Sequence, residues 1–297
     1  MRLTLAALLL SLASNQAALA GPPALAQPQP QPQLACQPVA LEATHFVTGE
    51  LLTFKIDALG AELGTMELSL ESPPLEAKPR AAFLLKARAR TSAFVSTNVK
   101  RYDAFPSALL GSDFSTLRYS EEIDEGETHR SQQVDFPPRE GKLKLRATKN
   151  GEPDDADVAA GPAARDLLSS LYLLRAQPMK IGTPFCLEVY AGRKMWRLSG
   201  QVAAREEIDT PLGHFATLKV DATAVRTDDP KVVRTAHVWV SDDERRLPLV
   251  AIAEVRGRAL RAQLTAATGS ATKPHGQAGP AGTEGRGSPR RPPLPKP

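Results

Sequence analysis

The sequence predicts a mainly β protein, either a curved antiparallel β-sandwich or an open barrel, with one short α-helix at about residues 162–176. Three observations lead to this prediction. Apolar and polar residues alternate along many short stretches, turn-forming residues separate those stretches, and a single stretch has helical spacing instead. Alternation with a period of two is typical of antiparallel strands that bury one face and expose the other to water.

The alternation is clearest in five stretches along the middle of the chain. They are residues 52–57, 85–90, 142–147, 218–221 and 260–264. Turn signals lie between them, at Gly60 and Gly64 and at residues 124–126, 150–151, 191–192 and 256–257. Glycine and asparagine in short connections between alternating stretches indicate hairpins, and we expect roughly ten to twelve strands.

The helix is predicted between Gly161 and Arg175. Leucines with helical spacing stand at Leu167, Leu168, Leu171 and Leu174. Pro162 suits the first turn of a helix, and Pro178 lies just beyond its end. We therefore expect an amphipathic helix that is held on the sheet by Leu167, Leu171 and Leu174.

Residues 1–20 have the pattern of a secretory signal peptide. Arg2 precedes an apolar run from Leu3 to Ala13, and the small-residue triplet Ala18-Leu19-Ala20 follows. The apolar run of about eleven residues is shorter than the about 20 that a transmembrane helix needs. We expect cleavage after Ala20, with Ala26 as the alternative. The protein is then exported, to the periplasm or the outer cell envelope.

The rest of the chain divides into three parts. Residues 21–35 form a Pro/Gln-rich linker, residues 36–268 a single β-rich domain, and residues 269–297 a basic Pro/Gly tail that we expect to be disordered. All fifteen aromatic residues lie between Phe46 and Trp239, which agrees with a core confined to the middle part.

The positive charge belongs to the tail. The tail has five Lys/Arg against Glu284, a balance of +4, and the whole chain also carries +4, so residues 1–268 sum to zero. Nucleic-acid binding needs basic residues clustered on a folded face, so we expect no nucleic-acid partner. The tail has two open interpretations, a solvated end or a segment that lies on an anionic polymer or lipid surface of the envelope.

The two cysteines, Cys36 and Cys186, are the complete set. In an exported chain such a pair indicates a disulfide, which here would join the start of the domain to its later half. The alternative is two separate buried thiols.

Four patches occur together in one order, at residues 49–54, 165–175, 210–215 and 239–248. With them the chain resembles the bacterial exported proteins grouped as domain of unknown function 3108, over most of residues 45–265. The resemblance implies an envelope location and a β-rich fold. It brings no activity and no catalytic residues.

Known catalytic and metal-binding motifs are absent from the sequence. There is no G-x-S-x-G elbow, no H-E-x-x-H, no C-x-x-C and no phosphate-binding glycine loop. The five histidines are scattered along the chain. We therefore predict no catalytic residue, no metal site and no cofactor.

A ligand-binding surface is the remaining hypothesis for chemistry. Its candidate residues are Asp166, Tyr172, Arg175, Trp196, Trp239, Arg101 and Tyr102. Arginine offers a planar fork for acidic groups, and aromatic rings offer stacking faces for sugars or acyl chains. The alternative is that the aromatic residues fill the core and that Arg175 pairs with a structural carboxylate.

The leading functional hypothesis is a non-enzymatic envelope protein that binds a lipid or a glycan, or that acts as an assembly factor. The alternative is a hydrolase or lyase acting on envelope polysaccharide or peptidoglycan through Asp/Glu acid–base catalysis. A cleft with two facing carboxylates about 5–10 Å apart would favour the enzyme. No membrane-spanning segment is expected, and the oligomeric state is left open.

Overall fold

The computed structural model describes residues 36, 41–42, 46–255 and 258–269. The predicted signal peptide, the linker at residues 21–35 and the tail beyond Gly269 lie outside this part of the chain, as does the expected turn at residues 256–257. None of the helices in the described residues has the length and apolar character needed to cross a bilayer.

The described residues form one sheet of 16 strands, in which every pairing is antiparallel except that of β10 with β11. The first half contains β1 (Glu50–Ala58), β2 (Ala61–Glu71), β3 (Phe83–Thr91), β4 (Tyr102–Leu110), β5 (Thr116–Glu125), β6 (Thr128–Asp135), β7 (Lys142–Lys149), β8 (Glu152–Pro153) and β9 (Ala156–Ala159). The second half contains β10 (Arg165–Asp166), β11 (Pro184–Ala191), β12 (Lys194–Thr210), β13 (Gly213–Arg226), β14 (Val233–Ser241), β15 (Pro248–Val255) and β16 (Arg258–Thr268).

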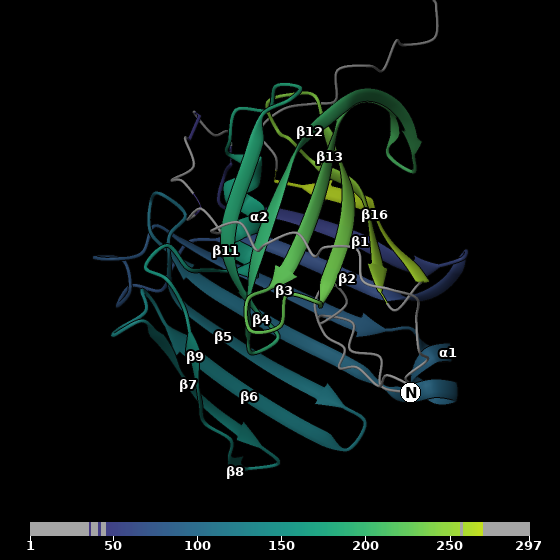
Figure 1. The fold of residues 1–297 in the computed structure, drawn as a ribbon. Helices are drawn as coiled ribbons and strands as arrows, with labels where there is room; N and C mark the ends of the chain where they lie inside the picture. Colours follow the sequence, from purple (N-terminus) through teal and green to yellow (C-terminus); the bar gives the residue numbers. More distant parts are fainter. Residues whose placement is uncertain (1–35, 37–40, 43–45, 256–257, 270–297) are drawn as a thin grey trace, which may run out of the picture.

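The sheet is single and open, so the open-barrel form of the prediction is closer than a sandwich of two separate sheets. Hydrogen-bonded neighbours follow the order β10 to β16, then β1 to β8, with β9 beside β7. The first and last strands thus pair in the middle of the sheet, where Leu51 is opposite Thr268. Figure 1 shows β1–β7 as one curved layer that β11–β14 cross.

The strand count exceeds the roughly ten to twelve that the alternation predicts. Part of the difference comes from β8, β9 and β10, which have two, four and two residues. So few residues alternate too briefly to be recognised.

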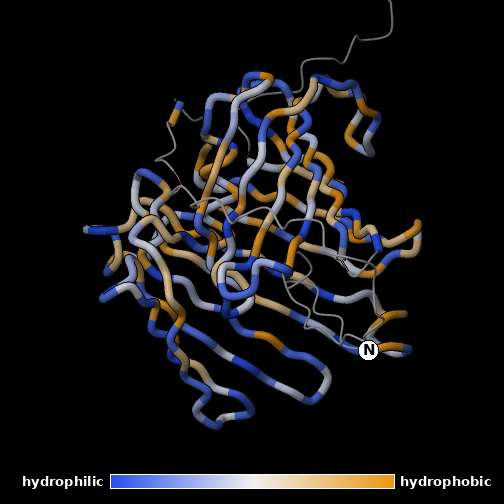
Figure 2. Tube along the Cα trace, viewed as in Figure 1, coloured by the Kyte–Doolittle hydropathy of each residue, from blue (hydrophilic) through white to orange (hydrophobic). Residues whose placement is uncertain are grey.

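The core follows the predicted alternation. Leu52, Phe54 and Ile56 of β1 are buried, whereas on β3 the buried Leu85 and Ala89 alternate with exposed basic residues. Figure 2 shows the same change between apolar and polar residues along the strands. The sheet therefore has an apolar inner face and a charged outer face.

The long helix is shorter than expected and begins later. The helix α2 spans Leu167–Arg175, not 162–176, because Arg165 and Asp166 pair with β11 as the parallel strand β10. Asp166 has extended backbone angles and caps the helix, so Pro162 lies outside it. Two further helical segments, α1 (Ala93–Val95) and the π-helix η2 (Ser96–Lys100), were not predicted, because they are too short to show a periodic pattern.

The residues that anchor α2 match the predicted leucines only in part. The predicted Leu167 and Leu174 are partly buried and pack against the core, but Leu168, Tyr172 and Leu173 are the fully buried residues, and Leu171 is only half-buried. The helix contacts β11 and also β3 and β4, so it lies between the two layers and buries more than one side. The helix therefore packs through more residues than the single leucine face that the spacing predicts.

Two described residues that precede β1, Cys36 and Glu42, are connected to later parts of the chain. The predicted disulfide between Cys36 and Cys186 is present, with Cα atoms 5.0 Å apart, inside the usual range of about 4.4–6.8 Å. The backbone N–H of Glu42 donates to the carbonyl of Ala176 at 2.8 Å. The start of the described domain is thus fixed to its later half.

Candidate functional site

Asp166 is a buried helix cap. Its carboxylate accepts hydrogen bonds from the backbone N–H groups of Leu168 at 2.8 Å and Ser169 at 3.1 Å, and from the hydroxyl of Thr116 at 2.6 Å. Burial raises the pKa of the Asp166 carboxyl. These contacts start α2 and connect it to β5, and they use the oxygens that a ligand would need.

Tyr172 and Arg175 lie on one side of α2 and meet a carboxylate that the sequence did not single out, Glu50 of β1. The Arg175 guanidinium donates to Glu50 Oε1 at 2.8 Å and to Oε2 at 2.9 Å, and the Tyr172 hydroxyl donates to Oε1 at 2.6 Å. All three residues are at most 4% exposed. We call Glu50, Tyr172 and Arg175 the inner cluster.

Backbone carbonyls and an aromatic ring complete the surroundings of the inner cluster. Arg175 also donates to the backbone carbonyls of Arg245 and Arg246, and the ring of Phe46 covers its guanidinium at 4.4 Å. Burial acts to raise the pKa of Glu50, but the hydrogen bonds and charge of Arg175 outweigh it and hold that pKa below its usual value. The geometry matches the alternative in which Arg175 pairs with a structural carboxylate. Ligand binding by these residues stays a prediction.

The four other candidate residues do not converge with the inner cluster. Trp196 and Tyr102 are buried, and the Trp196 indole donates to the carbonyl of Ala191 at 3.2 Å. Trp239 is partly exposed on β14 and donates to Glu206 at 2.7 Å, while the exposed Arg101 binds Asp103. Only Arg101 and Trp239 therefore reach the surface.

A pocket of about 740 Å³ lies on the outer face of β1–β4. Many of its lining residues stand at alternate positions of neighbouring strands: Glu67, Ser69 and Glu71 on β2, Lys86 and Arg88 on β3, and Phe105 and Ser107 on β4. Because alternate side chains of a strand share a face, folding brings these residues together with no motif in the sequence. Glu50 is also among the residues that line this pocket.

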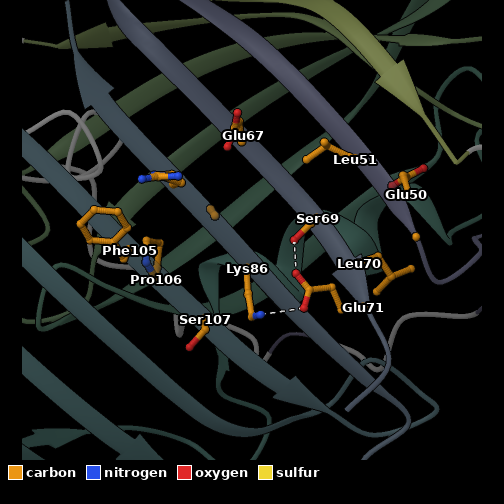
Figure 3. A pocket seen from close by; sticks show the side chains of 13 residues that line it. Glu50, Leu51, Glu67, Ser69, Leu70, Glu71, Lys86, Phe105, Pro106 and Ser107 are labelled. Atoms are coloured by element: carbon orange, nitrogen blue, oxygen red, sulfur yellow. Dashed lines mark hydrogen bonds and ion pairs between the residues drawn. The ribbon is translucent and has the colours of Figure 1, made fainter. Parts of the chain in front are cut away.

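One end of the pocket is electrically neutral. Lys86 Nζ donates to Glu71 Oε2 at 2.6 Å, and Ser69 Oγ donates to Glu71 Oε1 at 2.9 Å (Figure 3). Partial burial acts to raise the pKa of Glu71, but the bonds from Lys86 and Ser69 lower it overall. This end therefore offers no free charge to a ligand.

The other end carries Arg88 and Phe105 of the pocket lining, and Arg90 lies two residues farther along β3. Glu67 is opposite Arg88 in the register of β2 with β3. The guanidinium carbons of Arg88 and Arg90 lie 5.6 Å and 5.8 Å from the centre of the Phe105 ring. Among the described residues neither arginine forms an ion pair, whereas the nearby Lys86 and Arg101 do. We call Arg88, Arg90 and Phe105 the outer cluster.

Sequence reasoning missed the outer cluster although it identified the strand. The alternation at residues 85–90 placed the basic side chains on a solvated face, and that placement is confirmed. Only the pairing of β3 with β4 brings Phe105 beside them, and this register is not visible in either strand alone. Arg101, which sequence reasoning did select, lies immediately before β4 and donates a hydrogen bond to Asp103.

The acidic stretch at residues 121–127 does not form a facing carboxylate pair. Glu121 and Glu125 are buried, whereas Glu122 is exposed, as strand alternation requires. Glu121 accepts a hydrogen bond from Gln132, and burial raises its pKa. In the pocket, Glu67 and Glu71 are four residues apart on one strand, a Cα separation of about 13 Å.

Comparisons with solved structures show the fold alone. A β-barrel-like protein of family DUF1849 from Brucella abortus is 8% identical, covers 73% of this chain and 96% of its own, and has a TM-score of 0.51. A DUF1089 family protein from Pseudomonas aeruginosa is also 8% identical, over 61% of this chain and 86% of its own, with a TM-score of 0.32.

The sequence comparisons identify the family. No curated protein matches the chain. The model of the family described as "Protein of unknown function (DUF3108)" matches residues 52–265, which is most of the described domain and confirms the resemblance noted in the sequence. The chain therefore belongs to the DUF3108 family.

Proposed function

We propose that this protein is an exported, non-enzymatic binding protein of the cell envelope, and that its outer pocket binds an acidic glycan. The observation that carries the proposal is the outer cluster, two arginines that lie 5.6 Å and 5.8 Å from the centre of one aromatic ring and form no ion pair with any carboxylate in the described part of the chain. Export rests on the signal-peptide pattern of residues 1–20.

The chemistry of the outer cluster favours an acidic sugar. A guanidinium presents several N–H donors in one plane, which suits carboxylate and phosphate groups. An aromatic face supplies apolar contact to the carbon side of a sugar ring. Because the guanidinium groups of Arg88 and Arg90 lie 5.6 Å and 5.8 Å from the Phe105 ring centre, one sugar beside the ring would meet two cations.

A glycan fits this pocket better than a lipid. Binding an acyl chain favours a deep cavity with predominantly apolar walls. This pocket is open and its side chains include Glu67, Glu71 and Lys86. Hydrolysis of the glycan is not part of the proposal, because the carboxylates of Glu67 and Glu71 are attached to positions farther apart than a catalytic pair requires.

Isothermal titration calorimetry of the mature protein tests the proposal. The probes are an oligomer of galacturonic acid and a neutral oligomer of galactose of equal length. We expect binding of the acidic oligomer only, and a loss of at least tenfold in affinity for Phe105→Ala and for Arg88→Gln.

The matched control is Arg118→Gln, an exposed arginine of β5 that already has a partner, Asp135. Its affinity should equal that of the wild type. The proposal fails if the acidic oligomer does not bind, or if Arg118→Gln weakens binding as much as Arg88→Gln does.

A further inference from the structure

Two large apolar side chains project from one end of the sheet. Leu59, in the turn between β1 and β2, is 96% exposed, and Phe94 of α1 is 71% exposed. Both belong to the same end, because Ser92, which caps α1, donates its backbone N–H to the carbonyl of Leu63 near the start of β2 at 2.8 Å. Figure 1 shows the β1–β2 turn and α1 projecting on the same side, and Figure 2 shows apolar residues at both. We call Leu59 and Phe94 the apolar tips.

The turn between β1 and β2 does not itself require a leucine. Leu59 and Gly60 have φ angles of 51° and 83°, in the left-handed region. Two-residue hairpin turns of this kind favour asparagine, aspartate or glycine, and other residues are uncommon there. The Leu59 side chain is almost fully exposed, so it adds little to the core. Neither turn geometry nor core packing therefore accounts for an apolar residue at this position.

Phe94 is presented by an anchored turn. The hydroxyl of Ser92 accepts a hydrogen bond from the backbone N–H of Val95 at 3.3 Å, and Val95 is buried. The hydroxyls of Thr91 and Ser96 lie 2.8 Å apart and connect the end of β3 to η2. Because the backbone around Phe94 is already held in place, less entropy is lost when its ring contacts a partner.

The size of the apolar tips fits a lipid bilayer better than a protein partner. An aromatic side chain buries about 150–250 Å², whereas each partner in a standard protein interface contributes about 800 Å². Two separate side chains supply well under that area. A bilayer surface needs no matching shape, and apolar side chains are stabilised where they enter the boundary between headgroups and acyl chains.

The charged residues beside the apolar tips do not oppose a membrane surface. Glu62 forms an ion pair with Lys55 at 3.6 Å, and Glu125 forms one with Lys100 at 3.1 Å. Each of these carboxylates thus has a cation beside it. Their repulsion from acidic lipid headgroups is offset by the attraction of the two lysines.

We infer that Leu59 and Phe94 insert into the surface of a lipid bilayer of the envelope and hold the exported protein against it. This interaction goes beyond the proposed function, since neither residue lines the outer pocket. Even a myristoyl chain gives only marginal, reversible membrane binding. Two side chains therefore predict a weak and reversible association that increases with lipid concentration.

The test is sedimentation of the mature protein with vesicles of phosphatidylethanolamine and phosphatidylglycerol over a range of lipid concentrations. Leu59→Asn removes one apolar side chain and suits the left-handed backbone. Phe94→Ser removes the other from an exposed position. Because each inserted side chain contributes through its buried area, we expect Leu59→Asn alone to lower the partition coefficient severalfold and the double variant at least about tenfold.

The matched control is Leu75→Asn. Leu75 is 77% exposed and lies in the connection between β2 and β3, at the opposite end of β2 from the apolar tips. This variant should bind vesicles like the wild type. The inference is wrong if the wild type does not sediment with vesicles at any lipid concentration, or if Leu75→Asn loses as much binding as the double variant.

Light scattering distinguishes a second occupant of the same surface. A wild-type dimer that becomes a monomer in the double variant would show that the apolar tips join two copies of the chain, and it would overturn the membrane inference. The affinity of the double variant for the acidic oligomer is a separate readout and should equal that of the wild type. Failure of vesicle binding with retained glycan affinity would leave the proposed function intact.

Discussion

The inner and outer clusters are built from similar side chains but have opposite surroundings. In the inner cluster Arg175 lies against Tyr172 and Phe46, has both oxygens of Glu50 as partners and is buried. In the outer cluster Arg88 and Arg90 lie against Phe105 at the surface and have no carboxylate partner among the described residues. An arginine beside an aromatic ring is thus a recognition group only where its guanidinium is left without an internal partner.

The energetic consequences of the two arrangements differ as well. Removing one member of a buried ion pair leaves the other charge buried and unpaired, which costs about 3–5 kcal/mol. Removing an exposed side chain away from such contacts usually changes stability by less than about 0.5 kcal/mol. The inner cluster should therefore control folding, and the outer cluster should control binding.

The largest effect is expected from Arg175→Ala. Glu50 would keep its burial and lose its cation, so unfolding free energy should fall by about 3–5 kcal/mol. For a domain of this size, that is a drop in Tm of roughly 6–20 °C. Arg88→Ala is the matched control and should melt within about 2 °C of the wild type. Similar Tm losses for the two variants, measured by scanning calorimetry, would remove the distinction between the clusters.

The disulfide should protect the inner cluster. Cys36 precedes Glu42, which bonds to Ala176 at the end of α2, and Phe46, whose ring covers Arg175; the disulfide itself closes a loop with a sequence separation of 150. Cys36→Ser should cost about 2–5 kcal/mol. Limited proteolysis should then cut the segment before β1 first, while the affinity for the acidic oligomer stays unchanged. A variant that melts like the wild type would show that the segment is held by other contacts.

A smaller effect that depends on pH is expected from Glu121→Gln. Glu50 and Glu121 are both buried, but Glu50 has Arg175 as a partner whereas Glu121 has the neutral Gln132. Burial raises the folded-state pKa of Glu121 above 4.5. The protonated form is therefore favoured by folding. This contribution is fully present below the unfolded-state pKa and is lost as pH rises through the folded-state pKa.

Glutamine does not titrate, so the Tm of Glu121→Gln minus that of the wild type should increase between pH 4 and pH 7.5. The other carboxylates titrate equally in both proteins and cancel in this difference. A constant difference across the range would mean that Glu121 is not titrating in the fold.

The fold was predictable because it depends on periodicity within single strands. Alternation at residues 52–57 and 85–90 correctly predicted which of their residues are buried. The disulfide was predictable because the chain has only two cysteines. The helix boundary was less predictable, since the cap at Asp166 depends on the pairing of Arg165 and Asp166 with β11. That pairing is a contact between distant parts of the chain.

The site was predictable only in residue type. An Arg–aromatic combination was expected, but on α2, where Tyr172 and Arg175 are neighbours in sequence. Their partner Glu50 is 125 residues away from Arg175, so the burial of the pair could not be anticipated. The outer cluster likewise depends on the register of β3 with β4. Local sequence reveals which side chains share a face, and pairing between strands decides which of them meet.

Hydroxyl-radical footprinting with and without the acidic oligomer tests the central claim most directly, because it reports the solvent access of individual side chains. Phe105 is partly exposed in the free protein, as is Trp239 on the distant β14. We predict that a saturating concentration of the oligomer reduces oxidation of Phe105 severalfold and leaves Trp239 unchanged. Unchanged oxidation of Phe105, with protection of Trp239 instead, would contradict the account and move the binding site away from the outer cluster.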